Sequence, residues 1–312
     1  MSEGSSATAT SGTAGNTSTV DWRIIEDVRP LAAATSRAHA TVSAEQIDTF
    51  RRDGVVYLPG MFSQWIEPLR AGLDRNLRDP HRYAFPCEST AVGEPGRFFD
   101  SYCNWQLIPE YTAFVLTSAA AATAATLMRS TTAQLFHEHA FCKEVGTTKP
   151  TPWHQDLPYY CVDGPQTASV YIALDDIPAE IAVKFVAGSH LDGKLYYPRN
   201  FAEGRNYVSA DPNMGPVPDI DATVPSDRIA VRDLHAGDTI VFDFRTVHGS
   251  GSAPVAARRR AFSTRWLGDS AVFHPRPGET SPPLTGLGTR PGERMRADWF
   301  PVLWPNSPAG RC

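Results

Sequence analysis

From about residue 134 onward, the chain consists of short apolar segments rich in β-branched and aromatic residues, separated by Gly, Pro and Asp. Many short strands punctuated in this way predict a β-sandwich or barrel. The expected strands cover residues 134–143, 168–174, 183–186, 239–244 and 261–267. With 312 residues, the chain can form one such domain of about 200–250 residues with added helices.

Helical patterns dominate the part of the chain before these strands. Ser43-Ala44-Glu45-Gln46 has the form of a capping box, so a helix is expected to begin there. A strand is expected at residues 55–58, followed by helices at 62–77 and 111–129. Pro68 fits the second helix only in its first turn or at a kink.

Charge and composition narrow the class of partner. A formal net charge of −5 with a pI near 6.0 gives no general attraction to nucleic acid or to an anionic membrane. No apolar stretch approaches the ~20 residues that a membrane span needs. Five cysteines without a CxxC pair predict reduced thiols and a cytoplasmic location. We therefore expect a small-molecule substrate, no nucleic acid, no membrane, and a homodimer as the candidate assembly.

The chain divides into a tail and one domain. Residues 1–20 are mostly Ser, Thr, Ala and Gly, which predicts a disordered tail, and residues 21–312 are expected to form a single domain. Within it, residues 190–233 are rich in Pro, Gly, Asn and Asp, as is typical of a lid or insert. Residues 273–312 are rich in Pro and Gly and are expected to form a C-terminal surface extension or a subunit contact.

Two short segments far apart in the chain carry candidate metal ligands. His154 and Asp156 are two residues apart, so on a strand they would project to the same face. His248 follows a turn at 235–238 and an apolar run, which predicts a position at a strand end. Two histidines and one carboxylate form the facial triad that holds Fe(II) and leaves other positions open. His-x-Asp alone is common by chance, so the distant histidine is essential to this interpretation.

Basic residues follow the distal histidine. Arg258, Arg259 and Arg260 lead into the alternating run 261–266, where a fixed guanidinium can clamp a carboxylate through two hydrogen bonds. An arginine beside such a triad suggests a dicarboxylate co-substrate. Arg259 and Arg265 share strand parity, so both are expected to point inward while their neighbours point outward.

Five ordered motifs resemble the phytanoyl-CoA dioxygenase-like Fe(II)/2-oxoglutarate oxygenases. The resemblance runs from about residue 43 to residue 268. The motifs cover residues 50–60, 143–147, 153–160, 185–190 and 245–251. The resemblance implies a mainly β protein with flanking helices, built as a double-stranded β-helix (a cupin-like jelly roll).

The resemblance also implies the chemistry. Fe(II) would be the metal, 2-oxoglutarate and O2 the co-substrates, and ascorbate an activator. The residues implied as iron ligands and catalytic groups are His154, Asp156 and His248. Those implied for the C5 carboxylate of 2-oxoglutarate are Arg259 with Ser250 and Lys143, with Arg265 as the rival clamp and a surface role as the alternative for Lys143. A small metabolite, of secondary or lipid-like metabolism, would be hydroxylated, desaturated or rearranged, with release of succinate and CO2.

Other residues are candidates for contact with substrate or co-substrate. His137 and His139 share a face with Lys143 on one expected strand, and a structural role is the alternative for both. Tyr159 follows Asp156 closely enough to line a pocket mouth. Gln166 is a candidate polar contact to co-substrate or substrate, with a loop amide as the alternative.

Two other classes of protein fit parts of the pattern. A cupin-like isomerase or hydrolase can use the same triad with Mn, Ni or Zn, but it has no need of Arg259 to hold a dicarboxylate. A non-catalytic ligand-binding barrel has no need of the intact triad. Because Asp156 is retained as a carboxylate, the sequence also argues against a halogenase, in which a small residue replaces this acid.

Overall fold

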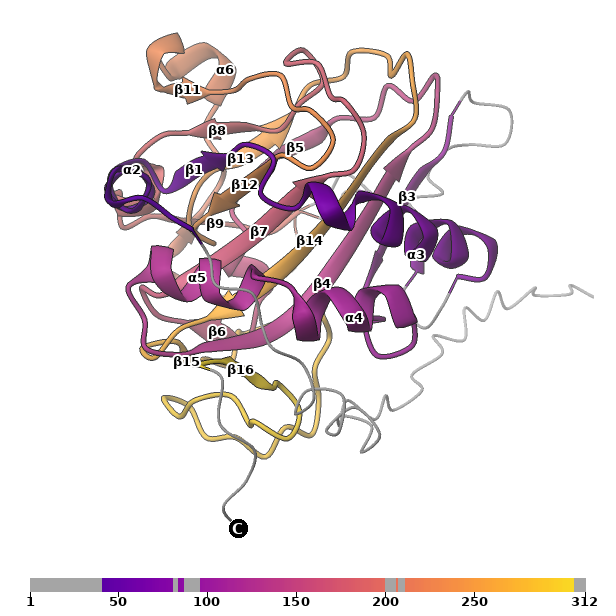
Figure 1. The fold of residues 1–312 in the computed structure, drawn as a ribbon. Coiled ribbons are helices and arrows are strands. Elements are labelled where there is room, and N and C mark those ends of the chain that lie inside the picture. Colours follow the sequence, from indigo (N-terminus) through magenta and orange to yellow (C-terminus); the bar gives the residue numbers. More distant parts are fainter. Residues whose placement is uncertain (1–40, 81–83, 87–95, 200–205, 207–210, 306–312) are drawn as a thin grey trace, which may run out of the picture.

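The computed structural model describes residues 41–80, 84–86, 96–199, 206 and 211–305. Within these residues, two antiparallel sheets face each other, and helices cover the outer side of the larger sheet (Figure 1). This is the mainly β jelly roll that the family resemblance implies, and it agrees with the sandwich or barrel expected from the strand pattern. The expected tail at residues 1–20 lies outside the described residues.

The larger sheet has eight strands within the described residues. Their spatial order is β1 (Val55–Leu58), β12 (Thr239–Phe242), β7 (Thr167–Ala173), β14 (Arg259–Leu267), β4 (Ala133–Lys143), β3 (Phe98–Tyr102) and β2 (Ala84–Pro86), with β16 (Val302–Trp304) also paired to β4. The smaller sheet has the order β11 (Ile229–Ala230), β8 (Lys184–Val186), β13 (His248–Ser250) and β5 (Thr151–His154). Two more strand pairs are β9 (Leu195–Tyr196) with β10 (Met214–Gly215), and β6 (Val162–Asp163) with β15 (Val272–Phe273).

The first described helix, α2 (Ala44–Asp53), begins and ends as its sequence predicts. The Ser43 side chain accepts a hydrogen bond from the backbone N–H of Gln46, and the Gln46 side chain accepts one from the backbone N–H of Ser43. Gly54 ends the helix with φ of 72°, a conformation that L side chains rarely adopt. Any Cβ at Gly54 would also lie 2.4 Å from the His190 ring. Both the backbone conformation and the lack of space therefore require glycine at this position.

Three helices cover the outer face of the larger sheet: α3 (Ile66–Arg78), α4 (Pro109–Thr117) and α5 (Ala120–Met128). Pro68 lies in the first turn of α3, as expected. The single helix expected at 111–129 is instead two helices bent by 46°, because Ser118 is extended and its side chain accepts from the N–H of Ala120. Within the described residues, no single helix is long and apolar enough to cross a membrane, although this bent pair passes that test by length and composition.

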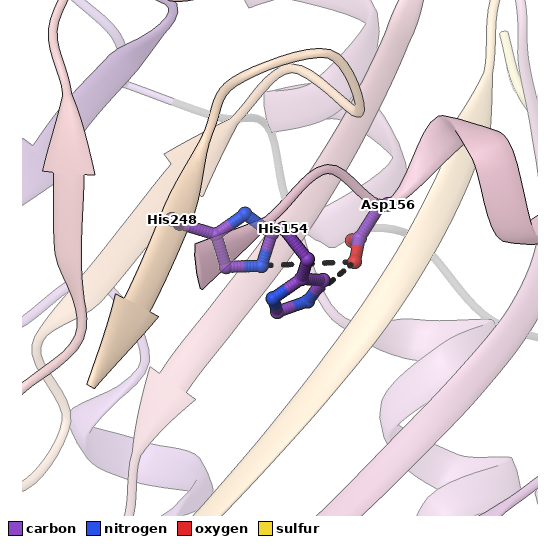
Figure 2. Close-up of side chains that lie close together, drawn as sticks. All are labelled: His154, Asp156 and His248. Carbon is purple, nitrogen blue, oxygen red and sulfur yellow. Dashed lines mark ion pairs between the residues drawn. The ribbon is translucent and has the colours of Figure 1, made fainter. Parts of the chain in front are cut away.

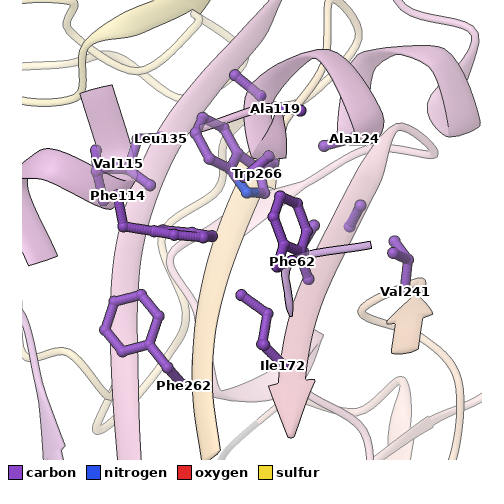
Figure 3. Packing of buried hydrophobic residues seen from close by; sticks show 14 of the residues in the cluster. Phe62, Phe114, Val115, Ala119, Ala124, Leu135, Ile172, Val241, Phe262 and Trp266 are labelled. Atoms are coloured by element: carbon purple, nitrogen blue, oxygen red, sulfur yellow. The ribbon is translucent and has the colours of Figure 1, made fainter. Parts of the chain in front are cut away.

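Alternation along β14 divides the protein into two interiors. Phe262 and Trp266 point toward the helices and are fully buried with Phe62, Phe114 and other apolar residues (Figure 3). Burying each such side chain stabilises the fold by about 1.5–3 kcal/mol. Residues of the opposite parity on β14 face the smaller sheet, and these carry the polar groups described below.

Residues 190–233 contain more regular structure than expected. The described part includes β9, β10, α6 (Ile220–Thr223), β11 and two 3-10 helices, Ser189–Leu191 and Ser226–Arg228. β11 pairs with β8 and so belongs to the smaller sheet. Residues 200–205 and 207–210 of this segment lie outside the described residues.

The C-terminal segment is less peripheral than expected. β15 pairs with β6, and β16 pairs with the beginning of β4. Phe300 and Leu303 are buried, and each packs in a different hydrophobic cluster of the protein.

Candidate metal centre and co-substrate site

His154 and His248 are neighbours across the smaller sheet. His154 is the last residue of β5, His248 is the first of β13, and the two are directly opposite in the antiparallel register. His248 lies at a strand end, as expected, but this is the start of a new strand and not the end of the preceding apolar one. β12 ends at Phe242, and a turn closed by the hydrogen bond from the N–H of Thr246 to the carbonyl of Asp243 carries the chain to the second sheet.

Asp156 reaches the two histidines by a route other than the expected one. It lies beyond β5 in a helical conformation (φ −70°, ψ −41°), just before the 3-10 helix Leu157–Tyr159. Strand alternation therefore does not explain its position. The turn brings its carboxylate beside both imidazole rings (Figure 2).

The three side chains form a compact set of metal-binding atoms. Oδ1 of Asp156 lies 3.7 Å from Nε2 of His154 and 3.7 Å from Nε2 of His248. All three ligand atoms lie within 4.8 Å of one another. Nδ1 of each histidine lies near a backbone carbonyl oxygen, that of Pro152 at 2.8 Å and that of Thr246 at 2.9 Å. These carbonyls fix the proton on Nδ1, which leaves both Nε2 atoms as metal ligands.

Electrostatics keep Asp156 and His248 in their metal-binding forms. Burial opposes the charge of Asp156, but the Arg265 guanidinium and the His154 ring outweigh it and hold the pKa of Asp156 well below its usual value. Burial, followed by the neighbouring His154, lowers the pKa of His248 to about 3. An ionised carboxylate and neutral imidazole are the protonation states that metal binding requires. The residues therefore fit Fe(II), as the triad chemistry implies.

Oδ2 of Asp156, the oxygen that faces away from the histidines, has its own partners. The Ser169 hydroxyl donates to it at 2.9 Å, and Nη2 of Arg265 lies 3.7 Å from it. Ser169 was not predicted from the sequence. Its only signal is a small polar residue in the middle of the largely apolar strand β7.

Arg259, Lys143 and Ser250 come together near one end of the sheets. Arg259 and Lys143 are directly opposite in register, and Nζ of Lys143 lies 3.4 Å from Oγ of Ser250. All three residues are buried. Nη2 of Arg259 lies 3.5 Å from the hydroxyl of Tyr171, and Arg259 has no carboxylate partner within the described part of the chain. Two buried cations side by side favour a bound anion.

The expected parity of the arginines is confirmed, and it separates their roles. Arg259 and Arg265 are buried, whereas Arg260 binds Asp175 and Arg258 binds Glu144 on the other side. Arg265 is already engaged, because its Nε donates to the hydroxyl of Tyr160 at 3.1 Å and its Nη2 faces Asp156. Arg259 is therefore better placed than Arg265 to receive a carboxylate from outside the chain.

The remaining candidates fall into two groups. His137 and His139 lie on the inner face of β4, and Nε2 of His139 is hydrogen-bonded to Asp100, which the sequence did not reveal. The Tyr159 ring packs edge-on against His154, with 5.8 Å between centroids. Gln166 does not face the site. Its side-chain amide donates to the carbonyls of Met128 and Arg129 at the end of α5, and its Oε1 accepts from the N–H of Ser270.

The sequence profile of the phytanoyl-CoA dioxygenase (PhyH) family matches residues 50–261. The chain belongs to this family. It is accordingly a non-haem Fe(II)/2-oxoglutarate-dependent oxygenase. None of the curated proteins matches the chain.

Several solved structures share the fold. The non-haem α-ketoglutarate-dependent carbocyclase SnoK from nogalamycin biosynthesis is 22% identical, with a TM-score of 0.64 over 86% of this chain and 99% of its own. The epimerase SnoN, in complex with Fe3+, α-ketoglutarate and nogalamycin RO, is 22% identical, with a TM-score of 0.60 over 83% and 97%. EctD from S. alaskensis, with 2-oxoglutarate and 5-hydroxyectoine, is 17% identical, with a TM-score of 0.61 over 85% and 89%.

Proposed function

We propose that this chain is a 2-oxoglutarate-dependent oxygenase of secondary metabolism that oxidises a small organic molecule in the cytoplasm. One observation carries the proposal. A buried His154-Asp156-His248 triad and a buried pair of cations, Arg259 and Lys143, occupy the interior between the same two sheets. The triad suits Fe(II), and the cations suit the far carboxylate of a dicarboxylate.

Each residue has a separate task in this proposal. His154, Asp156 and His248 hold the metal, while Ser169 and Arg265 fix the orientation of the carboxylate. Fe(II) with 2-oxoglutarate and O2 supplies the oxidising power for a C–H bond, and 2-oxoglutarate leaves as succinate and CO2.

Arg259, Lys143 and Ser250 bind the C5 carboxylate of 2-oxoglutarate and thereby set its direction relative to the metal. Tyr171 supports this contact, since its hydroxyl lies 3.5 Å from Nη2 of Arg259. The chain's contribution is thus orientation of the co-substrate and exclusion of water from a buried site.

A role in secondary metabolism is supported by SnoK and SnoN, which share the fold and come from nogalamycin biosynthesis. The reaction is hydroxylation, or a desaturation or rearrangement of the same substrate radical. The test incubates candidate metabolites with the protein, Fe(II), ascorbate and 2-oxoglutarate, and follows succinate release and product mass together. Metal-dependent turnover of a substrate without 2-oxoglutarate would instead favour a cupin-like isomerase or hydrolase.

A further inference from the structure

Three buried polar atoms on the inner face of the larger sheet have no hydrogen-bond partner within the described part of the chain. They are Nη1 of Arg265, Nε2 of His137 and Oγ of Ser263. These residues are only 4%, 3% and 0% exposed. Buried polar groups are nearly always hydrogen-bonded, and an exception requires an explanation. Three exceptions on one face point to a ligand that supplies the missing partners.

The sheet register brings the three side chains together. Arg265 and His137 are directly opposite across β14 and β4, so their Cβ atoms lie about 4.5–5.5 Å apart. Ser263 is two residues before Arg265 on the same face of β14. Nη2 of Arg265 is also 3.7 Å from Asp156, which places this group beside the metal centre.

The group combines a hydrogen-bond donor with an acceptor. Arg265 can only donate. Nδ1 of His137 lies 3.2 Å from the carbonyl oxygen of Glu138, which can only accept, so Nδ1 carries the proton. Burial, followed by the charge of Arg265, holds the pKa of His137 well below its usual value, so the ring is neutral and Nε2 is an acceptor. The Ser263 hydroxyl can serve in either role.

The same face extends toward solvent. His139, opposite Ser263 in register, and its partner Asp100 have side chains that are 17% and 14% exposed. These two side chains are thus nearer to solvent than those of Arg265 and His137, which lie one step further along the same face. Along β14, Ser263 and its partner His139 lie between Arg265 and Arg259, and Arg259 is the residue assigned to 2-oxoglutarate.

We propose that Arg265, His137 and Ser263 form the substrate-orienting site, in which Arg265 donates to a carbonyl or carboxylate oxygen and His137 accepts from a nearby substrate hydroxyl. This inference rests on the proposed function, because it places the substrate beside the metal. It identifies the substrate class as hydroxylated carbonyl or carboxylate compounds. An unfunctionalised alkyl chain would leave all three polar atoms without partners.

The test measures the binding of simple probes to the Fe(II)-loaded protein, saturated with 2-oxoglutarate and kept free of oxygen. The probes are 3-hydroxybenzoate, benzoate and 3-hydroxyacetophenone. In the two hydroxylated probes, the meta arrangement prevents both groups from chelating the metal. Calorimetry should show that 3-hydroxybenzoate binds about threefold to tenfold more tightly than benzoate, the effect of one hydrogen bond. Comparison with 3-hydroxyacetophenone shows whether the oxygen at Arg265 belongs to a carboxylate or to a ketone.

Variants then assign each contact. His137→Phe should remove the preference for the hydroxyl and leave benzoate binding unchanged. Arg265→Gln should weaken the binding of both acids while the preference remains. Arg258→Gln, which lies just before β14 and binds Glu144, should change neither property. Should Arg265→Gln fail to fold, His137→Phe and Ser263→Ala still test the site.

Equal binding of the two acids, no saturable binding of either, or a preference that survives His137→Phe would overturn the inference. Failure of the proposed function is recognised separately. A protein that does not bind 2-oxoglutarate in its own titration contradicts the function, whatever the probes do.

Discussion

The guanidinium of Arg265 lies 3.7 Å from Oδ2 of Asp156, while Oδ1 of the same carboxylate faces the two histidines. Each oxygen thus has its own environment. Ser169 and Arg265 hold Oδ2, so Oδ1 is the atom directed at the metal position. This arrangement favours a monodentate ligand and leaves more of the metal's coordination positions for co-substrate and O2.

The first prediction concerns the metal ligands. Replacing His154 or Asp156 with Ala should abolish substrate-coupled turnover and weaken Fe(II) binding, because one of three ligands is lost. Asp156→Glu should retain some metal but misplace it, since an added methylene shifts the carboxylate. Metal titration together with a succinate assay checks both effects. Near-normal turnover with one equivalent of iron in either Ala variant would show that the triad is misassigned.

The second prediction concerns the support of Asp156. Ser169→Ala removes the 2.9 Å hydrogen bond to Oδ2 and should weaken metal binding by about 10-fold to 100-fold, as is usual for groups that orient a metal ligand. The fold should persist, because the change removes one hydroxyl from a strand interior. Ser263→Ala, on the adjacent strand and without contact to Asp156, is the matched control. Identical iron affinity in the two variants would contradict the assignment.

The third prediction separates the two inward arginines. Arg259→Ala should raise the KM for 2-oxoglutarate by roughly 30-fold to several thousand-fold, because truncating a buried charged contact costs about 2–5 kcal/mol. Arg265→Ala should affect this KM less and should instead lower iron occupancy, since Arg265 contacts Asp156. If the two effects on KM are reversed, Arg265 is the carboxylate clamp.

Local sequence patterns were sufficient to predict the elements that are determined by interactions between residues close in the chain. The capping box at Ser43 and the Gly54 terminus defined α2, and the parity of Arg259 and Arg265 held in β14. The long helix expected at 111–129 failed because nothing in its apolar composition marks the extended conformation of Ser118. Propensity gives no information about such a break.

The site was predicted by residue type more successfully than by geometry. The sequence selected His154, Asp156 and His248 and expected His248 at a strand end, but it placed Asp156 on a strand, whereas Asp156 lies in a turn. Ser169 and Asp100 were missed because their partners are set by long-range register across the sheets. The alternation of side chains along a strand shows which face of the sheet a residue occupies, but it does not show which residue of the neighbouring strand lies opposite.

The fourth prediction concerns a buried acid outside the metal centre. Burial raises the pKa of Glu138 to about 7, against an ordinary value of 4.5, despite the hydrogen bond that its Oε1 accepts from the N–H of Asn104. The folded protein therefore holds this proton up to about pH 7, whereas the unfolded chain releases it near 4.5. The contribution of protonated Glu138 to the free energy of unfolding is therefore complete below pH 4.5. It is lost, by roughly 3 kcal/mol in total, as the pH rises from 4.5 to 7.

Glu138→Gln tests this dependence, because an amide oxygen can still accept from Asn104 but cannot ionise. Unfolding free energies of the two proteins should converge near pH 4.5, and the variant should be the more stable one at pH 8. Asp243, whose pKa burial also raises to about 7, remains in both proteins, so the measured quantity is their difference. A difference that does not vary with pH would show that Glu138 is ionised in the folded protein.

The last prediction concerns residues 190–233, which we expect to act as a lid. Gln155, between two of the metal-ligand candidates, ties this segment to the site: its Oε1 accepts from the N–H of Tyr196 at 3.1 Å, and its Nε2 donates to the carbonyl of Lys194 at 3.0 Å. If Asp156 shifts when metal and co-substrate bind, its neighbour Gln155 also shifts, and the hydrogen bond from Tyr196 to Gln155 changes. Closure over the substrate would exclude water from the reaction.

Hydrogen exchange of the iron-loaded protein measures this coupling. Amides across residues 190–233 should exchange more slowly when 2-oxoglutarate and substrate are bound together, and only slightly more slowly with 2-oxoglutarate alone. Gln155→Ala should speed exchange around Tyr196 and reduce the protection that ligands give, because the link to the site is lost. Gln166→Ala, whose amide holds the end of α5 instead, is the control. Equal protection in the ligand-free and fully loaded states would identify a fixed structural segment and leave substrate recognition to the sheet face at His137 and Arg265.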